Sequence, residues 1–156
     1  MNETKITARH ITYTALIAAA YAVSVLALAP ISFGPLQFRA ATMLKALAIL
    51  RPEFAVGFAI GNSIANHASP FGFWDWLIMP IFDLIGAYTA WKLRRYKPAA
   101  IIAQSLIIAT AVATFPLGLG GGLPWLPSFA CVLITSLVAI AIGTITLLPT
   151  LRTVIK

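Results

Sequence analysis

Four charged side chains stand within or beside apolar stretches of this sequence and are its first candidates for chemistry. Arg39 ends the helix-breaking segment Ile31–Arg39 (ISFGPLQFR), and Lys45 follows it within the next apolar run. Asp75 opens a later apolar run, and Asp83 lies two turns further along it. Ionisable residues inside membrane-type segments are rare and face a cavity or a partner. The four charges sum to zero, which suits a neutral or zwitterionic ligand.

Asp83 has two possible roles that the sequence leaves open. A buried unpaired charge is costly, so Asp83 is expected to pair with Lys45, or the two side chains straddle a ligand. Replacement of Asp83 by Asn separates the two roles. A structural pair predicts lost stability, whereas a ligand contact predicts lost binding with the fold retained.

Amide and aromatic side chains complete the candidate set. Asn62 and Asn66 are four residues apart and share one helix face, although amides also join membrane helices to one another. Trp125 could stack on a planar heterocycle or lie at the membrane interface. The full ligand-binding set predicted from the sequence is Gln37, Arg39, Lys45, Asn62, Asn66, Asp75, Asp83 and Trp125.

The composition of the chain differs from that of a soluble protein. Of the 156 residues, 60% are apolar and 10% are charged, and the mean hydropathy is +0.93. Soluble domains are about 45–50% apolar and about 25% charged. The sequence therefore predicts an integral membrane protein that forms one domain over residues 1–156.

The apolar runs predict an all-α fold of six helices. We expect helices at about 11–29, 40–50, 53–68, 74–93, 98–115 and 127–148. The second is too short to cross a hydrocarbon core of about 30 Å. The other five are expected to span the membrane, with Pro80 kinking the fourth helix and the uncharged segment 118–127 (GLGGGLPWLP) separating the last two.

The basic residues predict the orientation of the chain. The net charge is +7, and all of the eleven Lys and Arg residues except Arg39 and Lys45 lie at the same predicted ends of helices. An excess of Lys and Arg is typical of cytoplasmic ends, so both termini are expected to be cytoplasmic. This distribution argues against a nucleic-acid-binding face.

The sequence lacks the motifs that are typical of several other functional classes. The chain has no HExxH, GxSxG or P-loop motif and no paired histidines, so no catalytic residue, metal or cofactor is predicted. An intramembrane enzyme would have to use His67 with Asp75 or Ser69. A small channel is disfavoured because too few polar residues recur along any helix. Cys131 is the single cysteine, which excludes an intramolecular disulfide.

Two motifs resemble a known transporter family. ISFGPLQFR, and the pattern N-x-x-S-P-F-G-x-x-D at Asn66–Asp75, are similar to the queuosine-precursor transporter (QueT) family, whose members are substrate-binding S-components of energy-coupling factor (ECF) transporters. The resemblance implies six helices, cytoplasmic termini and a pocket that opens outward beneath the first loop. It implies a multi-pass protein of a prokaryotic cell membrane with no activity as an enzyme.

The resemblance also implies a substrate and partners. The substrate would be a small planar metabolite, a queuosine precursor with a 7-deazaguanine base, and the partners a transmembrane coupling subunit and, through it, two ATPase subunits. A small-residue face on the first helix would meet the coupling subunit. That face consists of Ala15, Ala18, Ala19 and Ala22, which could alternatively serve internal packing alone.

Two departures from the family pattern affect the substrate. Where the family continues R-x-S-E, this chain has Arg39-Ala40-Ala41-Thr42, and a Gly-Glu of the last helix is missing from the region Leu133–Ser136. Some family substrates carry an aminomethyl cation, which two carboxylates could hold. Because this chain lacks both carboxylates, another vitamin-like heterocycle remains an alternative substrate.

Overall fold

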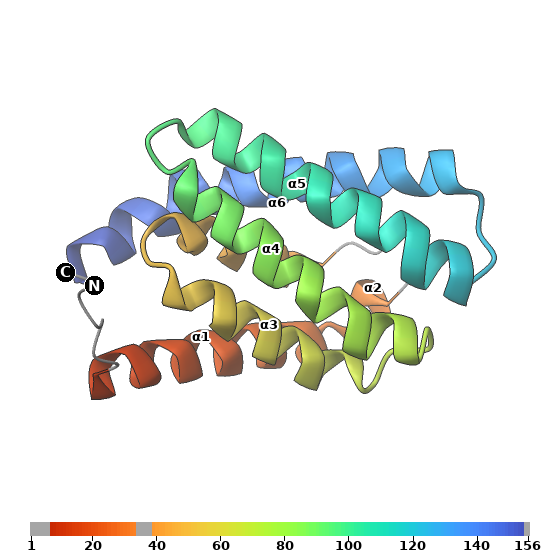
Figure 1. The fold of residues 1–156 in the computed structure, drawn as a ribbon, viewed down its shortest axis with the longest axis horizontal. Coiled ribbons are helices and arrows are strands. Elements are labelled where there is room, and N and C mark those ends of the chain that lie inside the picture. Colours follow the sequence, from red (N-terminus) through yellow and green to blue (C-terminus); the bar gives the residue numbers. More distant parts are fainter. Residues whose placement is uncertain (1–6, 34–38, 155–156) are drawn as a thin grey trace, which may run out of the picture.

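The computed structural model describes residues 7–33 and 39–154, and in these ranges the chain forms helices and turns without a strand. In chain order the elements are α1 (Ala8–Ala27), α2 (Ala29–Ser32), η1 (Ala40–Ile49), α3 (Glu53–Asn66), η2 (Trp74–Ile78), α4 (Met79–Lys92), α5 (Lys97–Thr114), η3 (Phe115–Gly120) and α6 (Trp125–Val154). The predicted all-α class is confirmed. Figure 1 shows the long helices running side by side in one bundle.

Three helical segments of the described chain are long and apolar enough to cross a bilayer: 8–27, 97–120 and 125–151. Together with the composition they confirm an integral membrane protein. α3 has 14 residues, or about 21 Å at 1.5 Å per residue, and is shorter than the predicted spanning length. Its bounds follow from Pro52, which precedes it, and from the turn that contains Pro70.

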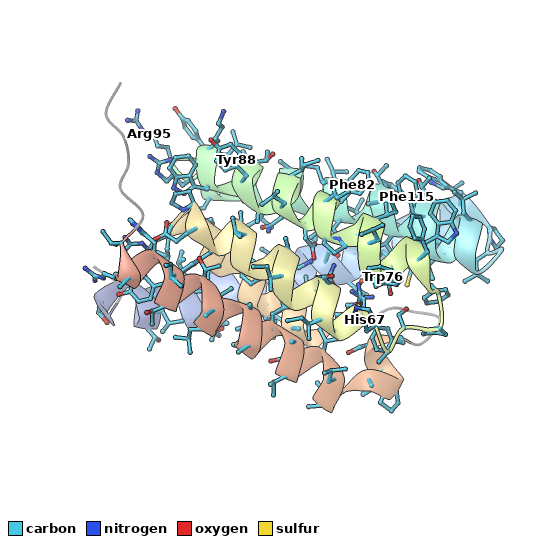
Figure 2. All side chains as sticks on the ribbon, turned by 60° about the horizontal axis from the view of Figure 1, so that its bottom comes forward. His67, Trp76, Phe82, Tyr88, Arg95 and Phe115 are labelled. Atoms are coloured by element: carbon cyan, nitrogen blue, oxygen red, sulfur yellow. The ribbon has the colours of Figure 1, made fainter. Side chains whose placement is uncertain are left out.

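The basic turns gather at one end of the bundle. α1 begins and α6 ends at this end, where the turn before α3 and the turn between α4 and α5 also lie (Figure 1). Figure 2 shows Arg95 there, whereas His67 and Trp76 lie toward the opposite end. The structure thus brings the basic segments together at a single end, as the predicted orientation requires.

Pro80 explains the irregular start of the fourth helix. Proline has no N–H to donate to the carbonyl oxygen four residues earlier, which belongs to Trp76. Ser63 of α3 donates its hydroxyl to that carbonyl oxygen instead, at 3.1 Å. The predicted kink therefore takes the form of a π-helical segment, η2, which leads directly into α4. Pro30 lies within the first turn of the short helix α2, where its missing N–H is tolerated.

α1 and α3 approach closely through small residues. A Cβ added at Gly57 would lie 2.8 Å from the carbonyl oxygen of Thr14, and one at Gly61 would lie 2.6 Å from that of Ala18. The face of α3 that contacts α1 therefore has two glycines four residues apart, a pattern that promotes close contact between helices in lipid. Gly57 and Gly61 were visible in the sequence as a signal for this contact.

This packing corrects the predicted alanine face. Ala18 and Ala22 are buried inside the chain, at 5% and 6% exposure, so they are not available to a coupling subunit. Ala15 and Ala19 remain exposed on the outer side of α1. The four alanines were grouped by their spacing, but residues three and four apart cover enough of a helix to reach both an inner and an outer side.

We expect Gly61→Ala to destabilise the bundle by about 1–3 kcal/mol, because the new methyl group must push α1 away from α3. Gly86→Ala is the matched control, since the nearest atoms to a Cβ there are side-chain atoms at 3.6 Å. That change should leave stability unchanged or raise it by up to about 1 kcal/mol through helix propensity. Thermal unfolding in detergent, followed by tryptophan fluorescence, measures both. Equal melting temperatures for the two variants would contradict the close contact.

Candidate functional site

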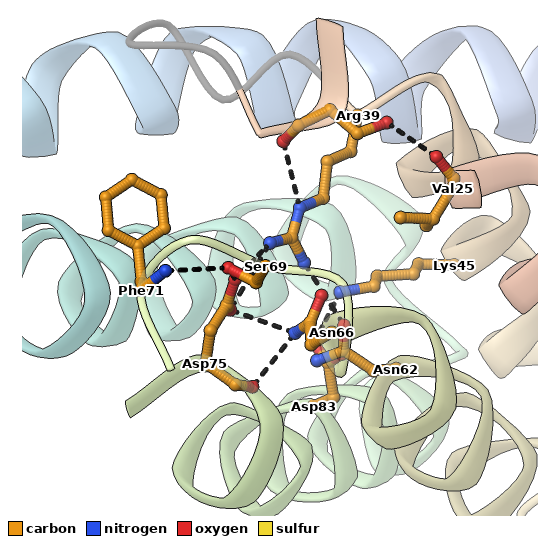
Figure 3. Close-up of polar contacts among 10 residues, drawn as sticks. Val25, Arg39, Lys45, Asn62, Asn66, Ser69, Phe71, Asp75 and Asp83 are labelled. Carbon is orange, nitrogen blue, oxygen red and sulfur yellow. Dashed lines mark hydrogen bonds and ion pairs between the residues drawn. The ribbon is translucent and has the colours of Figure 1, made fainter. Parts of the chain in front are cut away.

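A buried ion pair joins the segment before η1 to the start of η2. Arg39 is 8% exposed and Asp75 is fully buried, and Nη2 of Arg39 lies 2.9 Å from Oδ2 of Asp75. Nη1 of Arg39 donates to Oδ1 of Asn62 at 3.1 Å, and its Nε donates to the carbonyl oxygen of Ser32 at 3.4 Å. Figure 3 shows the guanidinium reaching from the residue before η1 to Asn62 on α3 and Asp75 on η2.

Neighbouring side chains fix the Asp75 carboxylate in place. Asn66 donates its amide to Oδ1 and to the backbone carbonyl oxygen of Asp75, both at 2.9 Å. Ser69 donates its hydroxyl to Oδ2 at 2.6 Å, and the same hydroxyl accepts the Phe71 N–H at 3.2 Å. The turn from Asn66 to Asp75 is therefore folded around this carboxylate, which explains why amide, hydroxyl and carboxylate recur in one short motif.

A second buried ion pair lies beside the first. Nζ of Lys45 donates to Oδ1 of Asp83, and these side chains are 4% and 0% exposed. The ammonium also lies 5.3 Å from the centre of the Tyr21 ring on α1, a cation–π distance. Of the two roles left open for Asp83, the structure shows the direct pair with Lys45. The two pairs connect η1 to η2 and to α4.

Several buried polar atoms around the pairs have no hydrogen-bond partner among the described residues. They are the Tyr21 hydroxyl, Nδ2 of Asn62, Oδ1 of Asn66 and Oδ2 of Asp83. Buried polar groups in native proteins are almost always hydrogen-bonded to protein or water. Unused donors and acceptors at the same cluster are therefore groups that a ligand or bound water can satisfy.

A small cavity of about 20 Å³ adjoins both ion pairs. Its lining comprises Arg39, Thr42, Lys45, Met79, Ile108, Val112, Val132 and Ser136. Thr42 and Ser136 both line this cavity, and they come from the two regions in which the sequence lacks the carboxylates that the resemblance implies. The volume has room for about one water molecule, so a larger ligand requires the wall to move.

Comparison with known proteins agrees with this architecture. A family model described as QueT transporter matches residues 11–153, nearly the whole chain. The chain belongs to the QueT transporter family. No curated protein and no solved structure matches it. The protein is accordingly a membrane transporter and not an enzyme.

Two of the predicted ligand-binding residues are not placed in the buried cluster of this QueT family member. Trp125 begins α6, is 45% exposed, donates Nε1–H to the Thr114 hydroxyl at 3.0 Å and stacks on Phe129. Gln37 lies outside the described residues. The structure brings together the other six, which are Arg39, Lys45, Asn62, Asn66, Asp75 and Asp83.

The QueT chain also places next to the ion pairs and the cavity three residues that the sequence prediction did not include. Tyr21, Thr42 and Ser136 are uncharged residues on three separate elements, so no local spacing connects them in the sequence. His67, the candidate for enzyme chemistry, is exposed and stacks on Trp76 with ring centres 4.9 Å apart. No cluster of three or more His, Cys, Asp or Glu residues suited to a metal occurs in the part of the chain that the structure describes.

Proposed function

We propose that this transporter is the substrate-binding subunit, the S-component, of an ECF-type uptake system in a prokaryotic cell membrane that it crosses several times. Its substrate is a small planar metabolite, a queuosine precursor with a 7-deazaguanine base. The proposed binding residues are Arg39, Lys45, Asn62, Asn66, Asp75 and Asp83, with Gln37 of the neighbouring segment. The protein captures the substrate and carries out no chemistry on it.

The observation that carries this proposal is the buried Arg39–Asp75 pair with its two amides. Nδ2 of Asn62 is an unused donor and Oδ1 of Asn66 is an unused acceptor, both beside the same ion pair. A 7-deazaguanine edge carries donors and acceptors side by side, so it can satisfy both kinds of atom. Small-molecule binding sites typically have a mostly apolar wall with a small number of fixed polar groups.

Mass spectrometry of small molecules released from the protein, purified in mild detergent, tests the substrate. A 7-deazaguanine base in stoichiometric amount would support the proposal, and direct binding of added 7-deazaguanine by calorimetry would confirm it. Release of another heterocycle would keep the transport role and overturn this substrate. If the protein releases nothing and added 7-deazaguanine does not bind, the substrate assignment is wrong.

A second candidate substrate is a different vitamin-like heterocycle that is neutral or zwitterionic. The pairing of each buried cation with its own carboxylate favours it, because the site has no net charge left for an ionic ligand. The released-molecule experiment separates this candidate from the first.

The energy for uptake would come from partner subunits. The sequence has no P-loop, so the proposed system relies on a transmembrane coupling subunit and, through it, two ATPase subunits. The outer side of α1 suits the coupling subunit, since Ala15 and Ala19 are exposed there beside Leu16 and Val23, which are 63% and 65% exposed. Small residues let another helix approach closely in lipid.

We expect Ala19→Leu to abolish co-purification with a coupling subunit and to reduce uptake at least tenfold, while ligand binding by the isolated protein stays unchanged. The larger side chain would hold the partner helix away. Ala130→Leu is the matched control, because Ala130 is an exposed alanine on α6. Normal assembly and uptake by the Ala19 variant would place the partner on another face.

A further inference from the structure

Three polar side chains lie at three-residue intervals along η1 and the residue before it. Arg39 precedes the helix, and Thr42 and Lys45 follow at three-residue intervals. Residues three apart eclipse each other in a 3₁₀-helix, whereas in an α-helix each such step falls about 60° short of a full turn. A 3₁₀-helix of ten residues is unusually long. This geometry brings Thr42 and Lys45 to one side of η1, and Arg39, the extended residue before the helix, lines the same cavity.

The cavity is rich in hydrogen-bond donors. Arg39 has five N–H donors and Lys45 has three, of which the carboxylates, Asn62 and Ser32 accept only part. Thr42 and, from α6, Ser136 add hydroxyls to the lining of the cavity. The remaining lining residues are aliphatic or Met79, and no carboxylate is among them.

The charges around the cavity are arranged unfavourably for a cation. Asp75 and Asp83 pair with Arg39 and Lys45 but do not line the cavity, so a ligand in the cavity contacts the two cations and neither carboxylate. An ammonium placed there would be repelled by like charges in a site of low dielectric constant. An uncharged carbonyl or ring nitrogen, in contrast, would accept hydrogen bonds from the unused donors.

We propose that this donor row receives the acceptor edge of an uncharged planar base, such as a lactam carbonyl, and discriminates against a base that bears an aminomethyl cation. This inference rests on the proposed function, because it specifies which form of the substrate the same site takes. Met79 is a flexible side chain in the cavity wall, and its unbranched thioether can move to admit a ring larger than the cavity of about 20 Å³.

The test compares two probes on the purified full-length protein. We expect 7-deazaguanine to bind at least tenfold more tightly than 7-aminomethyl-7-deazaguanine at neutral pH, as measured by calorimetry. Thr42→Val and Ser136→Ala should each weaken 7-deazaguanine binding about fivefold, the effect of one neutral hydrogen bond. Thr42→Glu should reverse the preference by placing a carboxylate in the cavity.

Matched controls separate the donor row from general effects of substitution. Thr146→Val and Ser128→Ala remove hydroxyls that donate to the backbone carbonyl oxygens four residues earlier and do not line the cavity, and should leave both affinities unchanged. Equal or tighter binding of the aminomethyl base, or unchanged 7-deazaguanine affinity in folded Thr42→Val and Ser136→Ala, would overturn the inference and leave the proposed function standing. Failure of both bases to bind would overturn the proposed substrate, and the inference with it.

Discussion

Asp75→Asn is expected to lower the free energy of unfolding by about 3–5 kcal/mol and to abolish ligand binding. The substitution keeps the shape of the side chain but leaves the Arg39 guanidinium, which is 8% exposed, without its counter-charge. Removing one partner of a buried ion pair leaves an uncompensated charge, and that charge accounts for the size of the effect. Unfolding in detergent with increasing denaturant, followed by fluorescence of the four tryptophans, measures the stability.

The double variant Arg39→Met, Asp75→Leu distinguishes a structural pair from a binding pair. Because it removes both charges, it should recover most of the stability lost by Asp75→Asn. It should still fail to bind 7-deazaguanine, since the polar contacts of both side chains are gone. Wild-type stability of Asp75→Asn would contradict the buried pair, and ligand binding by the double variant would exclude the pair from the site.

Lys45→Met and Asp83→Asn are each expected to cost about 3–5 kcal/mol of unfolding free energy, for the same physical reason at the second pair. Both side chains are nearly inaccessible, at 4% and 0%, and the remaining charge would have no solvent to stabilise it. The same denaturant titration measures these variants. Lys45→Met combined with Asp83→Leu should be more stable than either single variant.

The chain supplies its own control for this second prediction. Arg51 and Glu53 also form an ion pair, at 2.6 Å, but their side chains are 23% and 14% exposed and lie at the basic end of the bundle. Pairs that solvent reaches contribute about 0–1 kcal/mol, so Glu53→Gln should change stability little. A loss at Asp83→Asn no larger than at Glu53→Gln would show that Asp83 is not buried as described.

The sequence predicted the membrane class and the helical segments, because apolar runs are a strong signal on their own. It singled out Lys45 and Asp83 as isolated charges but left open whether they pair directly or straddle a ligand, and the structure shows the direct pair. Asn62, Asn66 and Asp75 were also expected to lie together. Asn66 and Asp75 belong to one motif, and Asn62 lies four residues before Asn66 on the same helix face. The sequence left open whether the alanine face meets a partner or packs internally. Tertiary packing decides this, since Ala18 and Ala22 are buried and Ala18 lies against Gly61 of α3.

The helix boundaries were less predictable. The last loop was expected over 118–127, but Phe115–Gly120 is helical and α6 already begins at Trp125. Gly and Pro were interpreted as helix breakers, yet Pro116 lies within the continuous helical run 97–120, where the helix changes to a π-helical form at Phe115. The 3₁₀ form of η1 had no local signal either, since the same residues suit an α-helix and packing decides between the two forms.

The form of η1 also determines how far ten residues reach. A 3₁₀-helix rises about 2.0 Å per residue and an α-helix 1.5 Å, so η1 extends about 20 Å where an α-helix of that size would extend about 15 Å. It therefore covers about two-thirds of a hydrocarbon core of about 30 Å. With this extra length, one short segment connects the buried Arg39 to Arg51 at the basic end, a distance that an α-helix of the same sequence would leave about 5 Å short.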